Sequence, residues 1–231
     1  LHIHWAEQVF WHRENRLTRL KRTLATLAAV ARVRRGGTRI VWMIHNLRPH
    51  EVQGIRKLLW PMLRYRLPQL IDGFMTLAPA TIDVVRRAYA GRFATLPAAA
   101  AYHPSYVPMP DLPDRAACRS ALGIEGGTVF GLLGRIRPYK GAERLIEAFR
   151  AHADPEARLL IAGQPLNSDY AAALRALAGD DSRILLRFDD LDDRTFAMCT
   201  LASDVIVLPY NQYLHSGALI YALSHGRPVL T

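Results

Sequence analysis

The sequence has few cysteines, no long apolar run and few acidic residues in its first half. Its two cysteines, Cys118 and Cys199, are too few and too far apart to predict a disulfide framework or a zinc site. This favours a reducing compartment, so we expect a cytoplasmic protein. No signal peptide is recognised, and no uncharged apolar run reaches the roughly 18 residues that cross a bilayer. Any membrane contact is expected to be peripheral, on the cytoplasmic face of the inner membrane.

The positive charge of the chain lies almost entirely in its first half. The net charge is +10, and residues 1–112 hold 17 Lys and Arg against 6 Asp and Glu, whereas residues 113–231 hold 13 against 14. A field of this kind attracts an anionic membrane surface, an acidic substrate or nucleic acid, and composition does not choose among them. No RRM, KH module or zinc finger is recognised, so we do not expect a nucleic-acid partner.

Short apolar, β-branched runs alternate with longer amphipathic segments, which predicts an α/β protein with parallel sheets. Helices are expected between the strands. The predicted strands are residues 1–5, 39–44 and 73–77 in the first half and 129–133, 158–162, 183–188, 204–208 and 228–230 in the second. Residues 103–113 contain four prolines and predict a boundary between domains 1–112 and 113–231. The chain begins without Met and both ends are strand-like, so we expect a partial chain with both domains incomplete.

The strongest local signal for a ligand is the predicted strand 129–133, which leads into residues 134–141 and then into a helix. Ligands in open α/β sheets bind at the carboxyl ends of strands. Gly134 and Gly141 allow close backbone approach, while Arg135 and Lys140 supply a forked and a point cation suited to a diphosphate. A solvated basic turn is the alternative. The segment matches neither the P-loop motif nor the dinucleotide-binding motif.

A second candidate site follows the predicted strand 204–208. Ser216 is placed to cap the next helix, so the backbone N–H groups of Ser216, Gly217 and Ala218, with His215 beside them, form a candidate anion site. Ordinary serine capping is the alternative. Because both turns follow strands of one domain, we expect them to face the same cleft.

Four segments in this order, residues 134–149, 159–163, 202–210 and 216–229, resemble the bacterial family 4 glycosyltransferases of the GT-B fold. The resemblance implies two Rossmann-like domains with parallel sheets facing a cleft, the acceptor held mainly by the first and the nucleotide sugar by the second. It implies hexosyl transfer from a nucleoside-diphosphate sugar to a saccharide or lipid-linked acceptor, with retention and without a catalytic metal or other cofactor. Arg135 and Lys140 align with the family's basic pair on the donor diphosphate, next to Gly134.

One departure from the family pattern concerns the donor sugar. The family commonly carries Glu-x7-Glu, whose carboxylates contact the sugar and ribose, but the aligned residues are Tyr213 and Tyr221. Sugar and ribose recognition must therefore differ, with backbone groups of residues 214–217 as candidates. A noncatalytic nucleotide-sugar-binding or regulatory protein on a GT-B scaffold is the alternative from another class.

In the first half, His45 follows the predicted strand 39–44. It resembles the family's first-domain histidine that contacts the transferred sugar, and His50 and Glu51 are candidate acceptor-side groups. Without the family context, a histidine satisfied at a strand end is the simpler interpretation.

Three further features have competing interpretations. His2 and His4 share one strand face but lack a nearby third ligand, so a metal site is not expected. Residues 189–193 are acidic, and helix capping explains them better than a cation site. Residues 56–66 mix basic and bulky apolar side chains, which fits either a helix on an anionic bilayer or a core helix with basic flanks. Pro61 should interrupt that helix unless it lies in the first turn.

Overall fold

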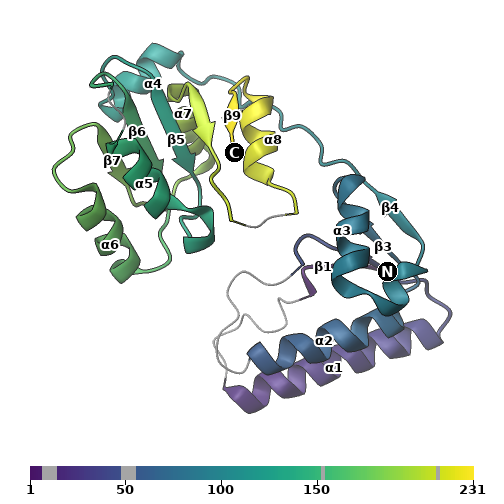
Figure 1. The fold of residues 1–231 in the computed structure, drawn as a ribbon. Helices are drawn as coiled ribbons and strands as arrows, with labels where there is room; N and C mark the ends of the chain where they lie inside the picture. The colour runs from purple at the N-terminus through teal and green to yellow at the C-terminus, as the bar shows by residue number, and fades with distance from the viewer. Residues whose placement is uncertain (7–14, 48–55, 152–153, 212–213) are drawn as a thin grey trace. The chain divides into compact units, whose positions relative to one another are not determined.

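The computed structural model describes residues 1–6, 15–47, 56–151, 154–211 and 214–231, with the backbone alone at 56–58. The chain forms two compact units, Leu1–His103 and Pro104–Thr231 (Figure 1). The division falls at the start of the proline-rich segment rather than after residue 112. The segment then joins the second unit, where the backbone N–H of Tyr106 donates to Ser224 Oγ at 3.0 Å.

The first unit has one parallel four-stranded sheet in the order β1-β2-β3-β4. A helix lies between each strand and the next, as the sequence pattern predicts for α/β units. In chain order the elements are β1 (His2–His4), α1 (Arg16–Arg35), β2 (Val41–Met43), α2 (Arg56–Leu70), β3 (Gly73–Thr76), α3 (Ala80–Tyr89), a 3-10 turn (Gly91–Ala94) and β4 (Ala98–Ala100).

The strand β4 was not expected, because residues 97–101 are mostly alanine. Alanine has low strand propensity and the segment shows no alternation of apolar and polar residues. Its strand conformation comes from pairing with β3, in which Phe74 lies opposite Ala98 and the Phe74 N–H donates to the Pro97 carbonyl at 3.0 Å. Tertiary pairing therefore overrides local preference here.

The expectation that Pro61 interrupts a helix is wrong, because α2 continues through Pro61 and also contains Pro68. The apolar side of α2 is buried in the unit, and this packing offsets the lost backbone hydrogen bonds. The buried residues of this side are Leu59, Trp60, Leu63 and Leu67. The structure thus favours the core-packing interpretation of residues 56–66 over a helix whose apolar side lies on a bilayer.

The second unit has a parallel five-stranded sheet in the order β7-β6-β5-β8-β9. Its elements are α4 (Arg115–Leu122), β5 (Val129–Leu133), a 3-10 turn (Pro138–Lys140), α5 (Ala142–Arg150), β6 (Arg158–Ala162), α6 (Ser168–Ala178), β7 (Ile184–Arg187), α7 (Asp193–Ala202), β8 (Val205–Val207), α8 (Gly217–Ser224) and β9 (Val229–Leu230). All five predicted strands of this half are present.

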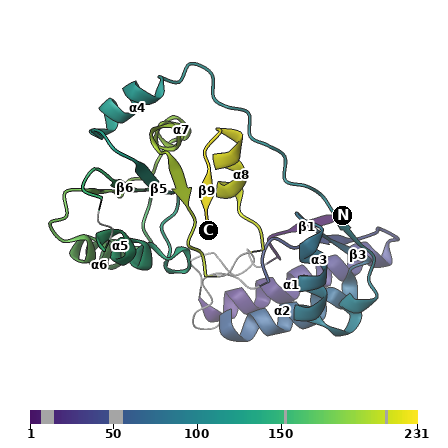
Figure 2. The same ribbon diagram turned by 45° about the horizontal axis from the view of Figure 1, so that its top comes forward.

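Helices cover both faces of this sheet (Figure 2). Alternate residues of β6 point to opposite faces: Leu159 and Ile161 pack with α5 and α6, while Leu160 and Ala162 pack with α4, α7 and α8. Cys118 and Cys199 are free thiols in the second of these cores, as expected from their spacing. In the described part of the chain, no helix is long and apolar enough to cross a membrane.

The side of β5 on which later strands are added changes along the chain. From β5 the chain proceeds outward to β6 and β7, and it later returns to β8 on the other side of β5. The carboxyl ends of β5 and β8 therefore flank a topological switch point, where open α/β sheets bind ligands. Both turns predicted to bind the donor start at this point.

Candidate functional site

The turn after β5 is fixed by glycine backbones. Gly134 has a φ of +97°, and its N–H donates to the Ala162 carbonyl at 2.9 Å. Gly163, after β6, has a φ of +136°, and a Cβ atom there would lie 1.9 Å from the Gly134 carbonyl oxygen. Only glycine permits this approach, so the ends of β5 and β6 together set the path of residues 134–141.

The two arginines of the turn lie in different surroundings. Arg137 donates to the carbonyls of Gln164 at 3.0 Å and Ile136 at 3.1 Å, so its guanidinium holds the turn against the residues after β6. Arg135 is exposed at the same turn. Arg135 is therefore the guanidinium available to an incoming anion.

Lys140 is the buried cation of the site. Its side chain is only 8% exposed, and its ammonium lies 5.4 Å from the centre of the Tyr210 ring. Burial, reinforced by the positive charges of Arg137 and Arg135, lowers the pKa of Lys140 to about 8. In the described part of the chain, no carboxylate forms an ion pair with it. A buried cation without a partner is costly, and a bound anion would relieve that cost.

The turn after β8 packs directly on the turn after β5. The Asn211 N–H donates to the Tyr139 carbonyl at 3.0 Å, and Arg144 of α5 donates to the Pro209 carbonyl at 2.7 Å. A Cβ atom on Gly141, whose φ is +74°, would lie 2.5 Å from the same Pro209 oxygen. The structure thus brings together the two turns that the sequence nominates.

The start of α8 is capped by serine. Ser216 is buried, and its hydroxyl accepts a hydrogen bond from the Leu219 N–H at 3.3 Å. Gly217 and Ala218 are the first residues of the helix, where backbone N–H groups lack intrahelical acceptors. His215 is half-buried just before the cap. Serine capping is confirmed, and anion binding by the first amides stays a prediction.

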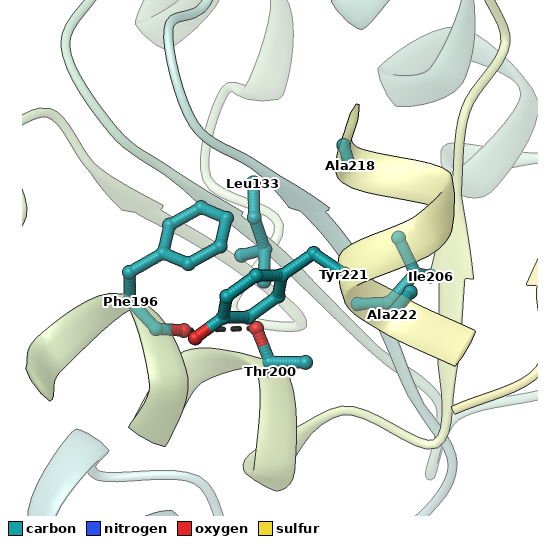
Figure 3. Close-up of a pocket in the computed structure, with 7 residues that line it drawn as sticks. All are labelled: Leu133, Phe196, Thr200, Ile206, Ala218, Tyr221 and Ala222. Atoms are coloured by element: carbon teal, nitrogen blue, oxygen red, sulfur yellow. Dashed lines mark hydrogen bonds between the residues drawn. The ribbon is translucent and has the colours of Figure 1, made fainter. Parts of the chain in front are cut away.

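Tyr221 of α8 faces a hollow between α7 and α8 (Figure 3). Its ring lies edge-on to Phe196, with centres 4.8 Å apart, and edge-on to Tyr106 at 5.1 Å, and it stacks on His225 at 4.2 Å. Burial raises the pKa of its hydroxyl. The hollow is lined by Leu133, Phe196, Thr200, Ile206, Ala218, Tyr221 and Ala222. Tyr221 is therefore held by aromatic packing on three sides.

The hollow adjoins the turn after β5. A Cβ atom on Gly134 would lie 3.7 Å from the Phe196 ring and 3.5 Å from Lys140 Nζ. Leu133, directly before Gly134, forms part of its wall. Gly134 thus lies next to both Lys140 and Phe196, and Phe196 in turn contacts Tyr221.

In the first unit, His45 follows β2 and contacts the end of β1. Its ring stacks on Trp5, with centres 4.3 Å apart and planes 2° apart, and its Nε2 lies 3.1 Å from His4 Nδ1. Trp5 has a φ of +50°, a conformation that is strained for a bulky residue. His4 therefore pairs with His45 at the carboxyl ends of neighbouring strands. Among the described residues, no group of three or more His, Cys, Asp or Glu is placed to hold a metal ion.

Three predicted site residues, His50, Glu51 and Tyr213, lie outside the described residues. The acidic segment 189–193 is described, and Asp192 caps α7 by accepting from the Thr195 N–H at 2.7 Å. The capping interpretation of that segment is confirmed.

Sequence reasoning missed three residues that shape this site. Tyr210 presents its ring to Lys140, Phe196 joins Gly134 to Tyr221, and Gly163 contacts the backbone of Gly134. Tyr210 directly follows Pro209 after a predicted strand, and Gly163 ends another, so strand-end positions gave a usable signal for both. Phe196 lies inside a helix and had no such signal.

Comparison with known proteins finds a family match within the second unit. Residues 127–231 match the model described as glycosyl transferases group 1. They form a group 1 glycosyltransferase domain. The whole chain is also 30% identical, over 237 residues, to a GDP-mannose:glycolipid 4-beta-D-mannosyltransferase of Xanthomonas campestris pv. campestris, and a second such relative is 31% identical over 234 residues. All of this chain is covered in both matches, but it spans 60% of the length of each relative.

Solved structures of other proteins resemble the fold of most of this chain. Anabaena HepE in complex with UDP superposes with a TM-score of 0.69 and 17% identity, covering 90% of this chain and 57% of HepE. WaaG, a glycosyltransferase involved in lipopolysaccharide biosynthesis, gives 0.61 and 19% identity, covering 95% and 65%. The expected GT-B fold is confirmed for the two units, each with its own parallel sheet.

Proposed function

We propose that the protein transfers a hexosyl group from a nucleoside-diphosphate sugar to a saccharide or lipid-linked acceptor. The observation that carries the proposal is Lys140, a buried ammonium without a described carboxylate partner at the switch point of a group 1 glycosyltransferase domain. Exposed Arg135 and the first amides of α8 belong to the same pair of turns. Together they supply the positive charge that a diphosphate requires.

The proposed chemistry depends on the leaving group. Breaking the glycosidic bond of the donor leaves negative charge on the nucleoside diphosphate, and cations that contact it stabilise the transition state. Lys140 and Arg135 would take this role, and Gly134 would let the diphosphate approach the backbone. The donor needs no metal in this scheme, so we expect transfer to survive chelation by EDTA.

Other residues are proposed for the sugar side of the reaction. His45 is proposed to contact the transferred sugar, with Trp5 and His4 holding its ring in place through the stack and the 3.1 Å contact. His50 and Glu51 are proposed on the acceptor side. The aromatic surroundings of Tyr221 support recognition of the sugar and ribose by groups other than a carboxylate at this position.

The relatives suggest which donor and acceptor to test first. Their names specify GDP-mannose and a glycolipid, so we propose GDP-mannose as donor and a lipid-linked saccharide as acceptor. UDP, which HepE binds, is the second nucleotide to test. Retention, implied by the family resemblance, is tested by the anomeric configuration of the product. The sugar of GDP-mannose is alpha-linked, so an alpha-linked product would support retention, whereas a beta-linked product, the linkage that the relatives' names give, would overturn it; NMR of the product distinguishes the two.

The proposed function is tested by donor binding followed by transfer. Thermal shifts with GDP-, UDP- and ADP-sugars identify the donor, and Lys140→Ala and Arg135→Ala should each reduce transfer about 100-fold or more, as loss of one charge-stabilising group does elsewhere. Arg175→Ala, on the exposed side of α6, is the matched control and should leave transfer unchanged. Unimpaired transfer in both site variants would refute the proposal. Donor binding without transfer to any acceptor would favour the noncatalytic alternative.

A further inference from the structure

His4 and His45 form a pair of imidazole rings at the carboxyl ends of β1 and β2. In the parallel pairing of these strands His4 lies opposite Met43, and His45 follows two residues later, so the register brings the two rings to the same end of the sheet. His4 Nδ1 lies 3.1 Å from His45 Nε2, and the ring centres are 5.3 Å apart. The two nitrogens are therefore at hydrogen-bond distance.

Two imidazole rings form a hydrogen bond only when one facing nitrogen carries a proton and the other a lone pair. A neutral histidine has its proton on one nitrogen and a lone pair on the other. Either His45 Nε2–H donates to His4 Nδ1, or His4 Nδ1–H donates to His45 Nε2. Each choice also decides whether Nδ1 of a neutral His45 bears a proton. The tautomers of the two rings are therefore coupled.

The stack of His45 on Trp5 leaves the tautomer of His45 open. The two ring planes are 2° apart, so the stack fixes the plane of the imidazole. A half-turn about the Cβ–Cγ bond keeps that plane but exchanges the positions of nitrogen and carbon atoms. A carbon of His45 would then face His4 Nδ1, so the contact with His4 distinguishes the two orientations.

Trp5, which forms the stack, has a strained backbone. Its φ is +50°, which a bulky side chain rarely adopts, and the residue is 40% exposed. Backbone strain persists where the surrounding structure holds it, and it is concentrated at functional sites. Because this exposed ring adds little to the core, its contact with His45 indicates a role at the site.

We propose that His4 is a positioning residue, which fixes the tautomer and the ring orientation of His45 by sharing one proton with it. The inference rests on the proposed function, in which His45 contacts the transferred sugar. It goes further, because it makes His4 decide whether His45 offers the sugar a donor or an acceptor. Sugar hydroxyls both donate and accept, so a single tautomer of His45 selects one orientation of the hydroxyl that it contacts.

Nuclear magnetic resonance reads the proton positions without any substrate. Long-range ¹H–¹⁵N spectra at about pH 8, where ordinary histidines are neutral, report which nitrogen of His45 is protonated, and His45→Gln identifies its signals. The wild type should show one tautomer of His45, whereas His4→Leu should show a mixture of both. The matched control is His2→Leu, an exposed histidine on the same face of β1, which should leave the His45 signals unchanged. An unchanged His45 spectrum in His4→Leu would overturn the proposal.

Transfer kinetics test the consequence for the reaction. With GDP-mannose and a lipid-linked acceptor, His4→Leu should lower kcat about 10- to 100-fold and leave the donor KM unchanged, as loss of an outer partner lowers activity at metal-binding histidines. His4→Asn places an amide atom near the position of Nδ1, so it should restore most of kcat and the single tautomer of His45. His2→Leu should transfer as the wild type does.

The two measurements separate failure of this inference from failure of the proposed function. A mixed tautomer of His45 with full kcat in His4→Leu would overturn the positioning role and leave glycosyl transfer intact. Absence of transfer in the wild type would refute the proposed function, and the spectra would still decide whether His4 fixes His45. Equal melting temperatures of His4→Leu and His2→Leu would exclude a general loss of stability as the cause.

Discussion

At the scale of single residues, Lys140 combines burial, two neighbouring guanidinium groups and the face of Tyr210. Desolvation favours its neutral form, while the ring face attracts its charged form. A diphosphate binds only the ammonium well. The protonation of Lys140 therefore couples donor affinity to pH within an experimentally accessible range.

Donor affinity should be nearly constant below the pKa of Lys140, about 8, and should fall as pH rises through it. Between about pH 7 and about pH 9 the apparent dissociation constant should rise about tenfold, since the free protein loses the proton that the bound state needs. Isothermal titration with the donor's nucleoside diphosphate measures this. Lys140→Arg keeps a charge across the range and should abolish most of the dependence. An unchanged pH profile in that variant would show that another group titrates.

The contribution of Lys140 to folding stability changes with pH in the direction opposite to donor affinity. The pKa of Lys140 is lowered from 10.5 in the unfolded reference to about 8, so the charged form is disfavoured in the folded protein. This penalty is fully present below about pH 8 and disappears as pH rises toward the unfolded pKa. Without ligand, stability from this residue therefore increases with pH while donor affinity decreases.

Gly163 provides a stability prediction for the turn. Gly163→Ala combines positive-φ strain with a Cβ atom 1.9 Å from the Gly134 oxygen, so it should destabilise the protein by more than about 3 kcal/mol and abolish donor binding. Gly123→Ala is the matched control, because Gly123 also has a positive φ of +69° but no atom within 4 Å of its Cβ position. It should cost only about 1 kcal/mol. Urea denaturation measures both, and equal losses would show that backbone strain alone matters.

The sequence predicted the chemistry of these residues better than their surroundings. Glycines, an arginine and a lysine after a strand were enough to propose a diphosphate site. The Tyr210 ring near Lys140 is distant in sequence, and pairing of β5 with β8 brings it to the site. The packing of Tyr221 on Phe196 likewise requires α7 and α8 to be neighbours. Local patterns do not contain that information.

At the scale of elements, Asp72 ties α1 to the start of the sheet in the first unit. Its carboxylate accepts from the Ile40 N–H at 2.9 Å and from Arg39 at 3.3 Å, and it lies 3.7 Å from Arg34 of α1. The backbone hydrogen bond from Ile40 is the largest cause of its lowered pKa, and the arginines add to it. One carboxylate therefore links a helix, the residue before β2 and the residue before β3.

Asp72→Asn should destabilise the first unit at neutral pH by about 1 kcal/mol, a modest value because water screens part of the interaction. A carboxylate with a lowered pKa contributes stability above its unfolded pKa and loses it as pH falls through the folded value. The difference between wild type and variant should therefore vanish in acid. Asp83→Asn, which removes an exposed carboxylate 3.8 Å from Arg86, should have little effect at either pH. Thermal denaturation at several pH values would contradict the prediction if the difference were independent of pH.

Most elements followed from periodicity, and the failures have physical reasons. The strands of the second unit are apolar runs buried on both faces, which is a strong pattern. The strand β4 has only alanines and depends on pairing with β3, and α2 contains Pro61 yet keeps its helix because its apolar side is buried. In both cases tertiary packing outweighs local preference. The bilayer interpretation of residues 56–66 failed because their pattern does not reveal which neighbour covers the apolar side.

At the scale of the whole molecule, charge and ligand chemistry separate along the chain. The excess of basic residues belongs to the first half, whereas the diphosphate candidates belong to the second unit. The prolines of residues 103–113 were enough to predict that the chain divides there. The division falls at His103 and Pro104, and the residues after it contact the second unit, as the hydrogen bond from Tyr106 to Ser224 shows; the proline pattern does not encode this.

This separation predicts that a nucleoside diphosphate, added without the sugar, stabilises the second unit and not the first. At a hundredfold excess over its dissociation constant, it should stabilise the unit that binds it by about 2.7 kcal/mol. Hydrogen exchange should slow in residues 134–141 and 214–218 and across the sheet of the second unit, while exchange in residues 1–103 should stay unchanged. Lys140→Ala should remove the protection, and Arg175→Ala should preserve it. Equal protection of both units would mean that they unfold as one cooperative body, and protection confined to residues 1–103 would place the diphosphate in the other sheet.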